Sequence, residues 1–437
     1  MRRQLYGIFS VRDWKTRLIF WSGALAVGLI AALFAVASNQ VMALHDSVIA
    51  KSRWWAFLVS PLAMIAVVTG TRLLFPGTQG SGIPQAIVAL RSDDDGLRRR
   101  MLSLRIAAGK LLLTLMGFLG GASIGREGPT VHIGASIMYS LGRFTKFPTH
   151  YIRHGLIMVG GAAGIAAAFN TPIAGIIFAI EEMARFYEER ATGLLLVAVI
   201  IAGLAALAIL GNYTYFGVSS ATLTGLHSWV AVVLCGIVGG LLGGGFSRLL
   251  LEGIKLLRPL MVKHWLAVAA ACGLTIAIFG LLSDGSSYGT GYAQARHILL
   301  GHATVDWAFP FYKIGATMSS YLSGAPGGIF SPSLSIGAGL GNDLSVFMPY
   351  VSPGAVVLLG MVGYFTGVVQ TPLTASVIVM EMVNDQSMVF PIITTAFIAL
   401  GVSKLVCKTP IYWALAEEFL AEKRVKTGTT LIPKQDP

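Results

Sequence analysis

One unusual segment occurs twice in this sequence. GASIGREGPTVHIGA (residues 121–135) aligns without gaps to GAPGGIFSPSLSIGA (residues 324–338), 203 positions later, and seven of the fifteen residues are identical. TPIAGIIFAIE (residues 171–181) matches TPLTASVIVME (residues 371–381) in the same order, at an offset of 200. Because two blocks recur at nearly one spacing, the sequence predicts an internal duplication.

Long apolar stretches surround these blocks. Of the 437 residues, 55% are hydrophobic and only 12% are charged, about half the charge of an average soluble domain. Four runs contain no Asp, Glu, Lys or Arg: residues 155–180, 191–247, 314–342 and 344–380. Each run can cross a hydrocarbon layer, which takes about 20 helical residues, and none shows the alternation of barrel strands. We therefore predict an all-α polytopic membrane protein and exclude a soluble fold.

The net charge of +12 is unevenly distributed. Lys and Arg gather in four places: residues 2–17, 91–100, 248–263 and 408–434. The positive-inside rule predicts that all four places, and with them both chain termini, lie in the cytoplasm. Nucleic acid is not expected as a partner, because the basic residues are not interleaved with aromatic residues that could stack on bases.

Each copy of the long block places a proline, Pro129 or Pro332, after a Gly-rich stretch. Proline is favoured in the first turn of a helix, so each block predicts a loop that enters a helix. A helix N-terminus presents unpaired N–H groups and partial positive charge, and it therefore binds anions. Gly-Ser-Gly-Ile-Pro (residues 80–84) and Lys-Thr-Pro-Ile-Tyr (residues 408–412) add hydroxyl groups to the same design. We expect several helix ends to converge on an anion where the duplicated halves meet.

Acidic residues in or beside the apolar runs are functional hypotheses, because a carboxylate is costly inside a membrane. Glu127 lies within the first long block, where a purely structural role would be an ion pair with Arg126. Glu181 aligns with Glu381 in the repeat, which suggests a shared scaffold role. Glu182 aligns with an apolar residue, so it is the better candidate for a function of one half only.

Together these motifs resemble the four signature regions of the CLC chloride channels and transporters, in the family's order and over nearly the whole chain. The resemblance implies a CLC-type fold of two inverted-topology repeats with many tilted and broken helices. It also implies a homodimer with one pathway in each subunit. Chloride would be bound by the hydroxyls of Ser81 and Tyr412 and by the main-chain amides of Ile329 and Phe330. A serine at position 81 favours chloride over nitrate or fluoride.

The resemblance also implies roles for two acids. Glu127 falls on the gating glutamate, which competes with chloride for the pathway and moves aside when protonated. Glu182 falls on the internal proton-transfer glutamate of proton-coupled members. We therefore predict secondary active exchange of H⁺ for Cl⁻, with chloride and protons as partners and without a cofactor or a metal ion. A passive voltage- or pH-gated chloride channel of the same fold stays open as the alternative.

The predicted organisation has five parts. They are a cytoplasmic N-terminal segment (residues 1–17), a first membrane repeat (18–247), a cytoplasmic connection (248–263), a second membrane repeat (264–412) and a short cytoplasmic tail (413–437). The regulatory nucleotide-binding pair of eukaryotic CLC proteins is not expected in this tail. The predicted location is the inner membrane of a bacterium, with several spans in the lipid bilayer.

Two other classes of function are less consistent with the sequence. A sodium-coupled carrier of amino acids would leave the anion-binding motifs unexplained. A membrane enzyme would require a catalytic motif, and the spacing of His150 and His154 lacks the glutamate of a zinc protease. Neither a Gly-x-Ser-x-Gly nor a phosphate-binding loop motif occurs. We therefore predict that the protein is not an enzyme.

Overall fold

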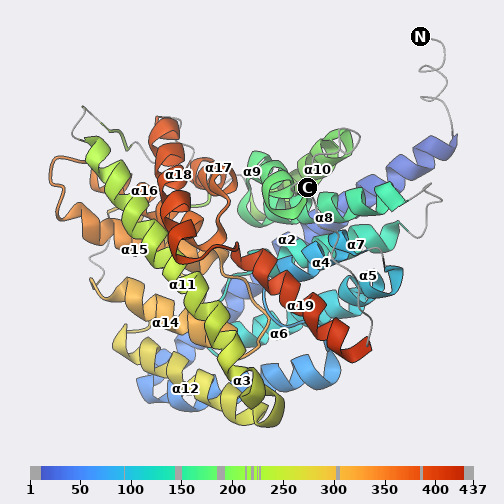
Figure 1. Cartoon of the computed structure of the whole chain (residues 1–437), viewed down its shortest axis with the longest axis horizontal. Helices are drawn as coiled ribbons and strands as arrows, with labels where there is room; N and C mark the ends of the chain where they lie inside the picture. The colour runs from blue at the N-terminus through green and yellow to red at the C-terminus, as the bar shows by residue number, and fades with distance from the viewer. Residues whose placement is uncertain are drawn as a thin grey trace.

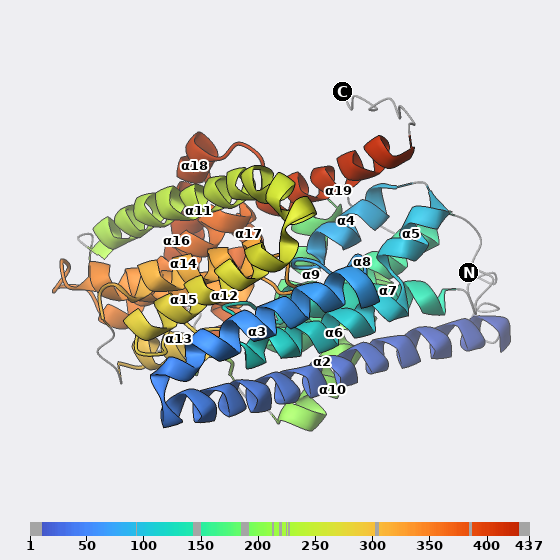
Figure 2. The ribbon, with the colours of Figure 1, turned by 90° about the horizontal axis from the view of Figure 1, so that it is seen from below.

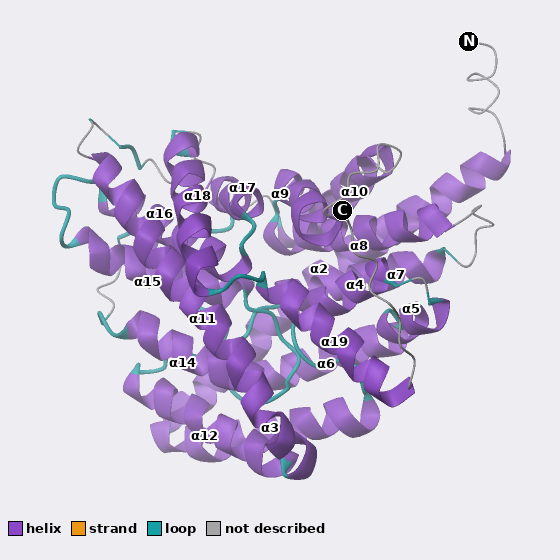
Figure 3. Cartoon of the chain, viewed as in Figure 1, coloured by secondary structure: helices purple, strands orange, loops and turns teal. Residues whose placement is uncertain are grey.

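The computed structural model describes residues 11–92, 94–142, 150–184, 192–211, 214–217, 221–223, 225, 228–301, 306–383 and 387–427. In this part of the chain nearly all residues are helical, and the only β-type pairings are two isolated bridges (Figure 3). Six helical stretches of the described residues are long and apolar enough to cross a membrane. The prediction of an all-α polytopic membrane protein is confirmed.

The helices of the first half end before the long segment that joins the halves. In chain order they are α2 (Val11–Lys51), η1 (Arg53–Trp55), α3 (Ala56–Thr69), η2 (Gly70–Leu74), α4 (Ile83–Arg91), α5 (Asp95–Met101), α6 (Leu104–Leu119), α7 (Glu127–Leu141), α8 (His150–Phe169), α9 (Pro172–Phe178), η3 (Ala179–Ala184) and α10 (Thr192–Leu210). Of the short elements, η1 is a 3-10 helix, whereas η2 and η3 are π-helical turns.

The second half begins with the long helix α11. Its helices are α11 (Trp229–Lys263), α12 (Trp265–Leu282), α13 (Tyr292–Leu299), α14 (Phe309–Leu322), α15 (Phe330–Ser345), α16 (Pro353–Val369), α17 (Pro372–Val383), α18 (Val389–Val406) and α19 (Ile411–Thr427). Residues 248–263, predicted as a connection, are helical and continuous with α11. The predicted segments 1–17 and 413–437 lie partly outside the described residues.

The two halves lie against each other and exchange neighbours at their edges: in Figure 1 yellow α12 lies beside blue α3, and red α19 lies across α4. Their long first helices, α2 and α11, run along opposite sides of the molecule (Figure 2). Equivalent helices share equivalent neighbours, because α7 packs on α8 in the first half as α15 packs on α16 in the second. This arrangement is the one expected of a duplicated, inverted pair.

Helix α16 forms the centre of the second half, and all of its residues from Ala355 onward are buried. It contacts α11 through glycines: a Cβ added to Gly367 would lie 2.5 Å from Gly239 O. Only small residues allow such a close approach of two membrane helices. Large apolar side chains on the outer helices, such as Leu204 and Phe397, are exposed, as expected of surfaces that face lipid.

Both halves are interrupted at the same place. Helix α6 ends at Leu119 and α14 ends at Leu322, and a loop follows each of them. The next helices, α7 and α15, carry Pro129 and Pro332 in their first turns, as the sequence predicts. These breaks position two helix N-termini inside the protein rather than at its surface.

Candidate ion-binding site

The two repeated loops are hydrogen-bonded to each other. Gly125 N donates to Gly328 O at 2.6 Å and Gly328 N donates to Gly125 O at 2.7 Å, and these two glycines are equivalent in the repeat. Gly80 N also donates to Ala325 O (3.1 Å), and Gly327 N donates to Gly80 O (3.2 Å). Helices α4, α7 and α15 therefore start close to one set of paired loops, which Figure 3 shows in the middle of the helices.

Glu127 is fully buried as the first residue of α7. Its Oε1 accepts a hydrogen bond of 2.6 Å from Ser331 Oγ, in the first turn of α15, the equivalent helix of the other half. Its Oε2 has no hydrogen-bond partner among the described residues and lies over the Cα of Gly125. The Arg126 guanidinium donates to Ala35 O in α2. The carboxylate of Glu127 thus has one partner and one oxygen with spare hydrogen-bonding capacity.

The hydroxyls of Ser81 and Tyr412 are buried near this carboxylate. Both residues are fully buried, and neither hydroxyl forms a hydrogen bond of standard geometry with the described residues. The Tyr412 hydroxyl lies beside the Ser81 side chain and within electrostatic range of Glu127 and Glu182. Buried polar groups normally find a partner, so these two hydroxyls are available to a ligand.

Main-chain donors come from the start of α15. Ile329 is its N-cap and Phe330 its first residue, and the first N–H groups of a helix have no partner within the helix. The Phe330 ring packs against Phe365 and Phe178, with ring centroids 4.8 and 6.0 Å apart, and lies 5.8 Å from the ring of Tyr412. This aromatic packing fixes the direction of the first turn of α15.

Glu182 approaches the same region from another element. It lies in the π-helical turn η3 and is 1% exposed. Trp413 Nε1 donates to Glu182 O at 3.2 Å, which ties this turn to the residue that follows Tyr412. Such turns inside helices are common at functional sites. The structure therefore brings together all six residues that the sequence analysis selected.

A family model for the voltage gated chloride channels matches residues 62–404. The chain belongs to this family. It is 28% identical over 452 residues to an H(+)/Cl(-) exchange transporter ClcA of Yersinia pestis, with 97% of this chain and 92% of the relative covered. A ClcA exchange transporter of Salmonella typhimurium is 28% identical over 417 residues, with 91% of this chain and 87% of the relative covered.

Solved structures give the same result for the fold. The chain is similar to a slow cyanobacterial Cl-/H+ antiporter with a TM-score of 0.81 and 25% identity, over 93% of this chain and 99% of that one. It is also similar to a CLC-type fluoride/proton antiporter with a TM-score of 0.80 and 20% identity, over 93% and 98% of the two chains. The predicted CLC-type fold is confirmed.

Two acids of this CLC chain hold its halves together. The Glu181 carboxylate accepts hydrogen bonds from Leu373 N (3.2 Å) and Thr374 N (2.6 Å) in the first turn of α17. The Glu381 carboxylate accepts from Ile173 N (3.2 Å) and Ala174 N (2.7 Å) in the first turn of α9. Glu181 thus caps the helix that carries Glu381, and Glu381 caps α9, which runs directly into the turn η3 that carries Glu181. These reciprocal contacts agree with the scaffold role that the alignment of the two acids suggests.

The sequence analysis missed a pair of buried lysines. Lys110 in α6 and Lys313 in α14 are 203 positions apart, the offset of the long block, and both are fully buried. Lys110 Nζ donates to Gly80 O at 2.9 Å. Lys313 Nζ donates to Gly289 O at 2.8 Å and to the carbonyls of the two preceding residues. The position of each lysine within an apolar helix could have indicated this pair, because a charged side chain inside a membrane is costly.

These lysine contacts reveal a third repeated block. GSGIPQA (residues 80–86) aligns with GTGYAQA (residues 289–295) at an offset of 209, with four of seven residues identical. Gly82 and Gly291 have positive φ angles, 102° and 76°, and each is the N-cap of its helix, α4 or α13. Glycine adopts this conformation without steric cost. Each half therefore has a loop whose equivalent carbonyl is held by an equivalent lysine.

The histidine pair considered for an enzyme has another environment. His154 Nε2 lies 2.9 Å from Nη2 of the buried Arg98, whereas the side chain of His150 lies outside the described residues. Within the described ranges, no group of three His, Cys, Asp or Glu side chains could hold a metal ion. His154 thus belongs to a contact between the α8 helix and α5.

Proposed function

We propose that this chain exchanges chloride for protons across a membrane. The observation that carries the proposal is the position of Glu127, a buried carboxylate at the start of α7, beside two buried hydroxyls that form no hydrogen bond of standard geometry with the described residues. The names of its relatives support the proposal, since they are exchange transporters or antiporters. One carboxylate in an anion pathway links the two ions, as the following steps explain.

Chloride loses water when it enters the pathway. We propose that the hydroxyls of Ser81 and Tyr412 and the main-chain amides of Ile329 and Phe330 offset this loss. These donors are neutral, so they stabilise the ion without the strong attraction of a full positive charge, which would slow its release. The chain needs no cationic side chain in the pathway itself.

Glu127 couples the two fluxes. When ionised, its carboxylate competes with chloride for the same donors and is stabilised by the hydrogen bond from Ser331. When protonated, it carries no charge, loses this advantage and leaves the pathway to chloride. Since the same group carries the proton and excludes the anion, the two ions move in opposite directions.

Glu182 supplies protons from the other side of the pathway. It is buried in η3 and lies within electrostatic range of Tyr412. Proton transfer between the two acids takes a route separate from that of chloride, with water as the carrier. Because its counterpart in the other half is Met382, this route exists on one side only.

The membrane arrangement follows from the same features. We propose a multi-pass protein of a bacterial inner membrane with both termini in the cytoplasm, since this side receives the four basic regions. The five parts predicted from the sequence are retained, with residues 248–263 as the cytoplasmic end of α11. All the proposed site groups come from a single chain, so a homodimer would contain one pathway in each subunit.

Transport in liposomes tests the proposal. A chloride gradient across liposomes that contain the wild-type chain should drive protons uphill, followed by a pH-sensitive dye. Glu127→Ala should abolish proton pumping and keep chloride flux, whereas Glu252→Gln, at an exposed ion pair of α11, should change neither. Chloride flux without proton movement in the wild type would indicate a passive channel, and pumping by Glu127→Ala would reject Glu127 as the coupling group.

A further inference from the structure

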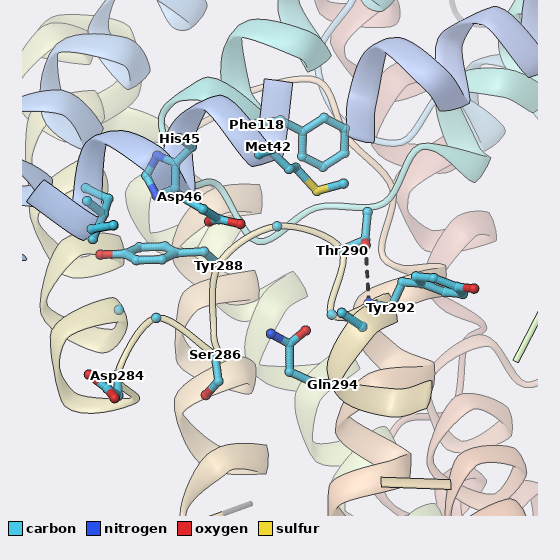
Figure 4. A pocket seen from close by; sticks show the side chains of 18 of the residues that line it. Met42, His45, Asp46, Phe118, Asp284, Ser286, Tyr288, Thr290, Tyr292 and Gln294 are labelled. Atoms are coloured by element: carbon cyan, nitrogen blue, oxygen red, sulfur yellow. Dashed lines mark hydrogen bonds between the residues drawn. The ribbon is translucent and has the colours of Figure 1, made fainter. Parts of the chain in front are cut away.

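Two large cavities in the described part of the molecule are each lined by elements of both halves. The first, of about 770 Å³, lies between the end of α2 and the loop that precedes α13. The second, of about 600 Å³, lies between the end of α11 and the loop that precedes α4. Figure 4 shows the first cavity, with Asp46 of α2 close to the loop that carries Tyr288 and Thr290. We call them the α2 cavity and the α11 cavity.

The two cavities are lined by equivalent residues. In the loops, Gly80 of the α11 cavity corresponds to Gly289 of the α2 cavity at the offset of 209. In the long helices, four lining positions correspond at a constant offset of 212: Met42 with Ile254, Asp46 with Arg258, Ile49 with Met261, and Ala50 with Val262. The two cavities are thus equivalent under the repeat, since each combines the long first helix of one half with the repeated loop of the other. In an inverted pair, equivalent cavities lie on opposite sides of the membrane.

Each cavity reaches one end of the candidate site. Gly80 lines the α11 cavity and precedes Ser81 in the chain. Asn39 lines the α2 cavity, and its Oδ1 accepts a hydrogen bond of 3.0 Å from Arg126 Nη1, next to Glu127. The α11 cavity therefore borders the loop that carries a proposed chloride donor, and the α2 cavity borders a side chain bonded to the neighbour of the proposed proton carrier.

The α2 cavity has a net negative charge. Its charged side chains are Asp46, Asp284 and Arg53, and Arg53 Nη1 pairs with Asp284 Oδ1 at 3.2 Å. Asp46 is left without an ion-pair partner among the described residues. The titratable groups beside it are His45 on the same helix and Tyr288 across the cavity, whose rings contact edge to face at 4.7 Å. With a neutral imidazole, the cavity carries one net negative charge.

The α11 cavity has the opposite sign. Its charged side chains are Arg72, Arg258 and Glu418. Arg72 Nη2 donates to Met261 O, and its guanidinium lies 5.5 Å from the centre of the Trp265 ring. Counted together, the three charged side chains sum to one net positive charge. The sign reversal between the cavities is concentrated at one repeat position, where the first half has Asp46 and the second has Arg258.

We infer that the two cavities are aqueous approaches of opposite charge, in which Asp46 favours protons over chloride and Arg258 favours chloride. A charged vestibule with low-dielectric walls changes the local concentration of ions. The α2 cavity would therefore concentrate protons near Glu127 and lower the local chloride concentration, whereas the α11 cavity would concentrate chloride near Ser81. This inference rests on the proposed function and adds an asymmetry between the two faces.

Sided transport tests the inference. Right-side-out and inverted membrane vesicles expose opposite cavities, and chloride uptake in each is measured against chloride concentration and pH. Asp46→Arg should lower the half-saturating chloride concentration about fivefold in one vesicle type only, and Asp46→Asn about twofold. Arg258→Glu should raise it in the other vesicle type only. Asp284→Asn changes the cavity charge by the same amount but at a side chain that is 81% exposed, so solvent screening should make its effect smaller. Glu252→Gln should have none.

Two further readouts separate electrostatics from damage to the fold. Half-maximal uptake by Asp46→Arg should require more protons on the side where chloride binding improves. Both effects should shrink at high concentrations of an impermeant salt, because the screening length falls to about 3 Å at 1 M. Equal effects of the Asp46 and Arg258 changes on one face, or no effect of either in a chain that transports normally, would overturn the inference. A wild-type chain without chloride uptake would contradict the proposed function instead.

Discussion

The two halves of the molecule share a scaffold and differ in their acids. Both halves break one helix at the same place and hold an equivalent glycine carbonyl with an equivalent lysine. At the start of the next helix, however, the first half has Glu127 where the second has Phe330, and later Glu182 where the second has Met382. Under the proposed function, both copies therefore supply helix ends for an anion, and only the first copy supplies acids for the proton.

The largest expected effect comes from giving the first half the residue that the second half has at the equivalent position. We expect Glu182→Met to abolish uphill proton movement in liposomes while chloride flux persists, because an apolar side chain cannot hold a proton. The reciprocal change Met382→Glu should create no second proton route, since the acid alone lacks a connection to Glu127. Proton coupling in Glu182→Met at the wild-type level would show that the route does not use this residue.

The lysine pair tests whether equivalent contacts have equivalent roles. Lys110→Met removes the charged donor of Gly80 O, next to Ser81 in the chain, and leaves Gly327 N as its donor, so we expect an about tenfold weaker apparent affinity for chloride. Lys313→Met removes the donor of three carbonyls in the loop before α13, and it should mainly lower thermal stability. Chloride uptake normalised to folded protein, with the unfolding temperature in detergent, separates the two outcomes. Equal effects of both changes on uptake would contradict a special role of Lys110.

The reciprocal caps provide a test of symmetry. Glu181→Gln and Glu381→Gln each weaken two hydrogen bonds to a helix N-terminus, and we expect each to destabilise the protein by about 1 kcal/mol. Because the two contacts are geometrically alike, the two losses should be nearly equal, as measured by chemical or thermal unfolding in detergent. A strong effect of only one change would show that the halves are not held in a symmetric way.

Much of this architecture could be predicted from the sequence, because the duplication places the same Gly and Pro motifs in both halves. The recurrence of Gly and Pro predicts the broken helices, and the alignment of Glu181 with Glu381 predicts their scaffold role. The third block was missed because Pro84 has an alanine as its counterpart, so the proline that both copies of the other blocks share is absent from its second copy. The alignment of the repeats also does not predict that the equivalent glycines Gly125 and Gly328 form hydrogen bonds with each other, because this contact depends on how the halves pack.

The smallest expected effect concerns a contact that crosses between the halves. Ser331→Ala removes the 2.6 Å hydrogen bond to Glu127 Oε1, and water can replace part of it, so we expect a change of about threefold in transport rate. Its direction follows from the charge: the hydroxyl stabilises the ionised carboxylate in the pathway, so the variant should reach half-maximal transport at a higher pH. Ser333→Ala is the matched control, because Ser333 lies two residues further along α15, is also buried and contacts no carboxylate in the described part. If both variants keep the wild-type pH profile, the Ser331 hydroxyl has no role in gating. The second half would then act on Glu127 through main-chain donors and through no side chain.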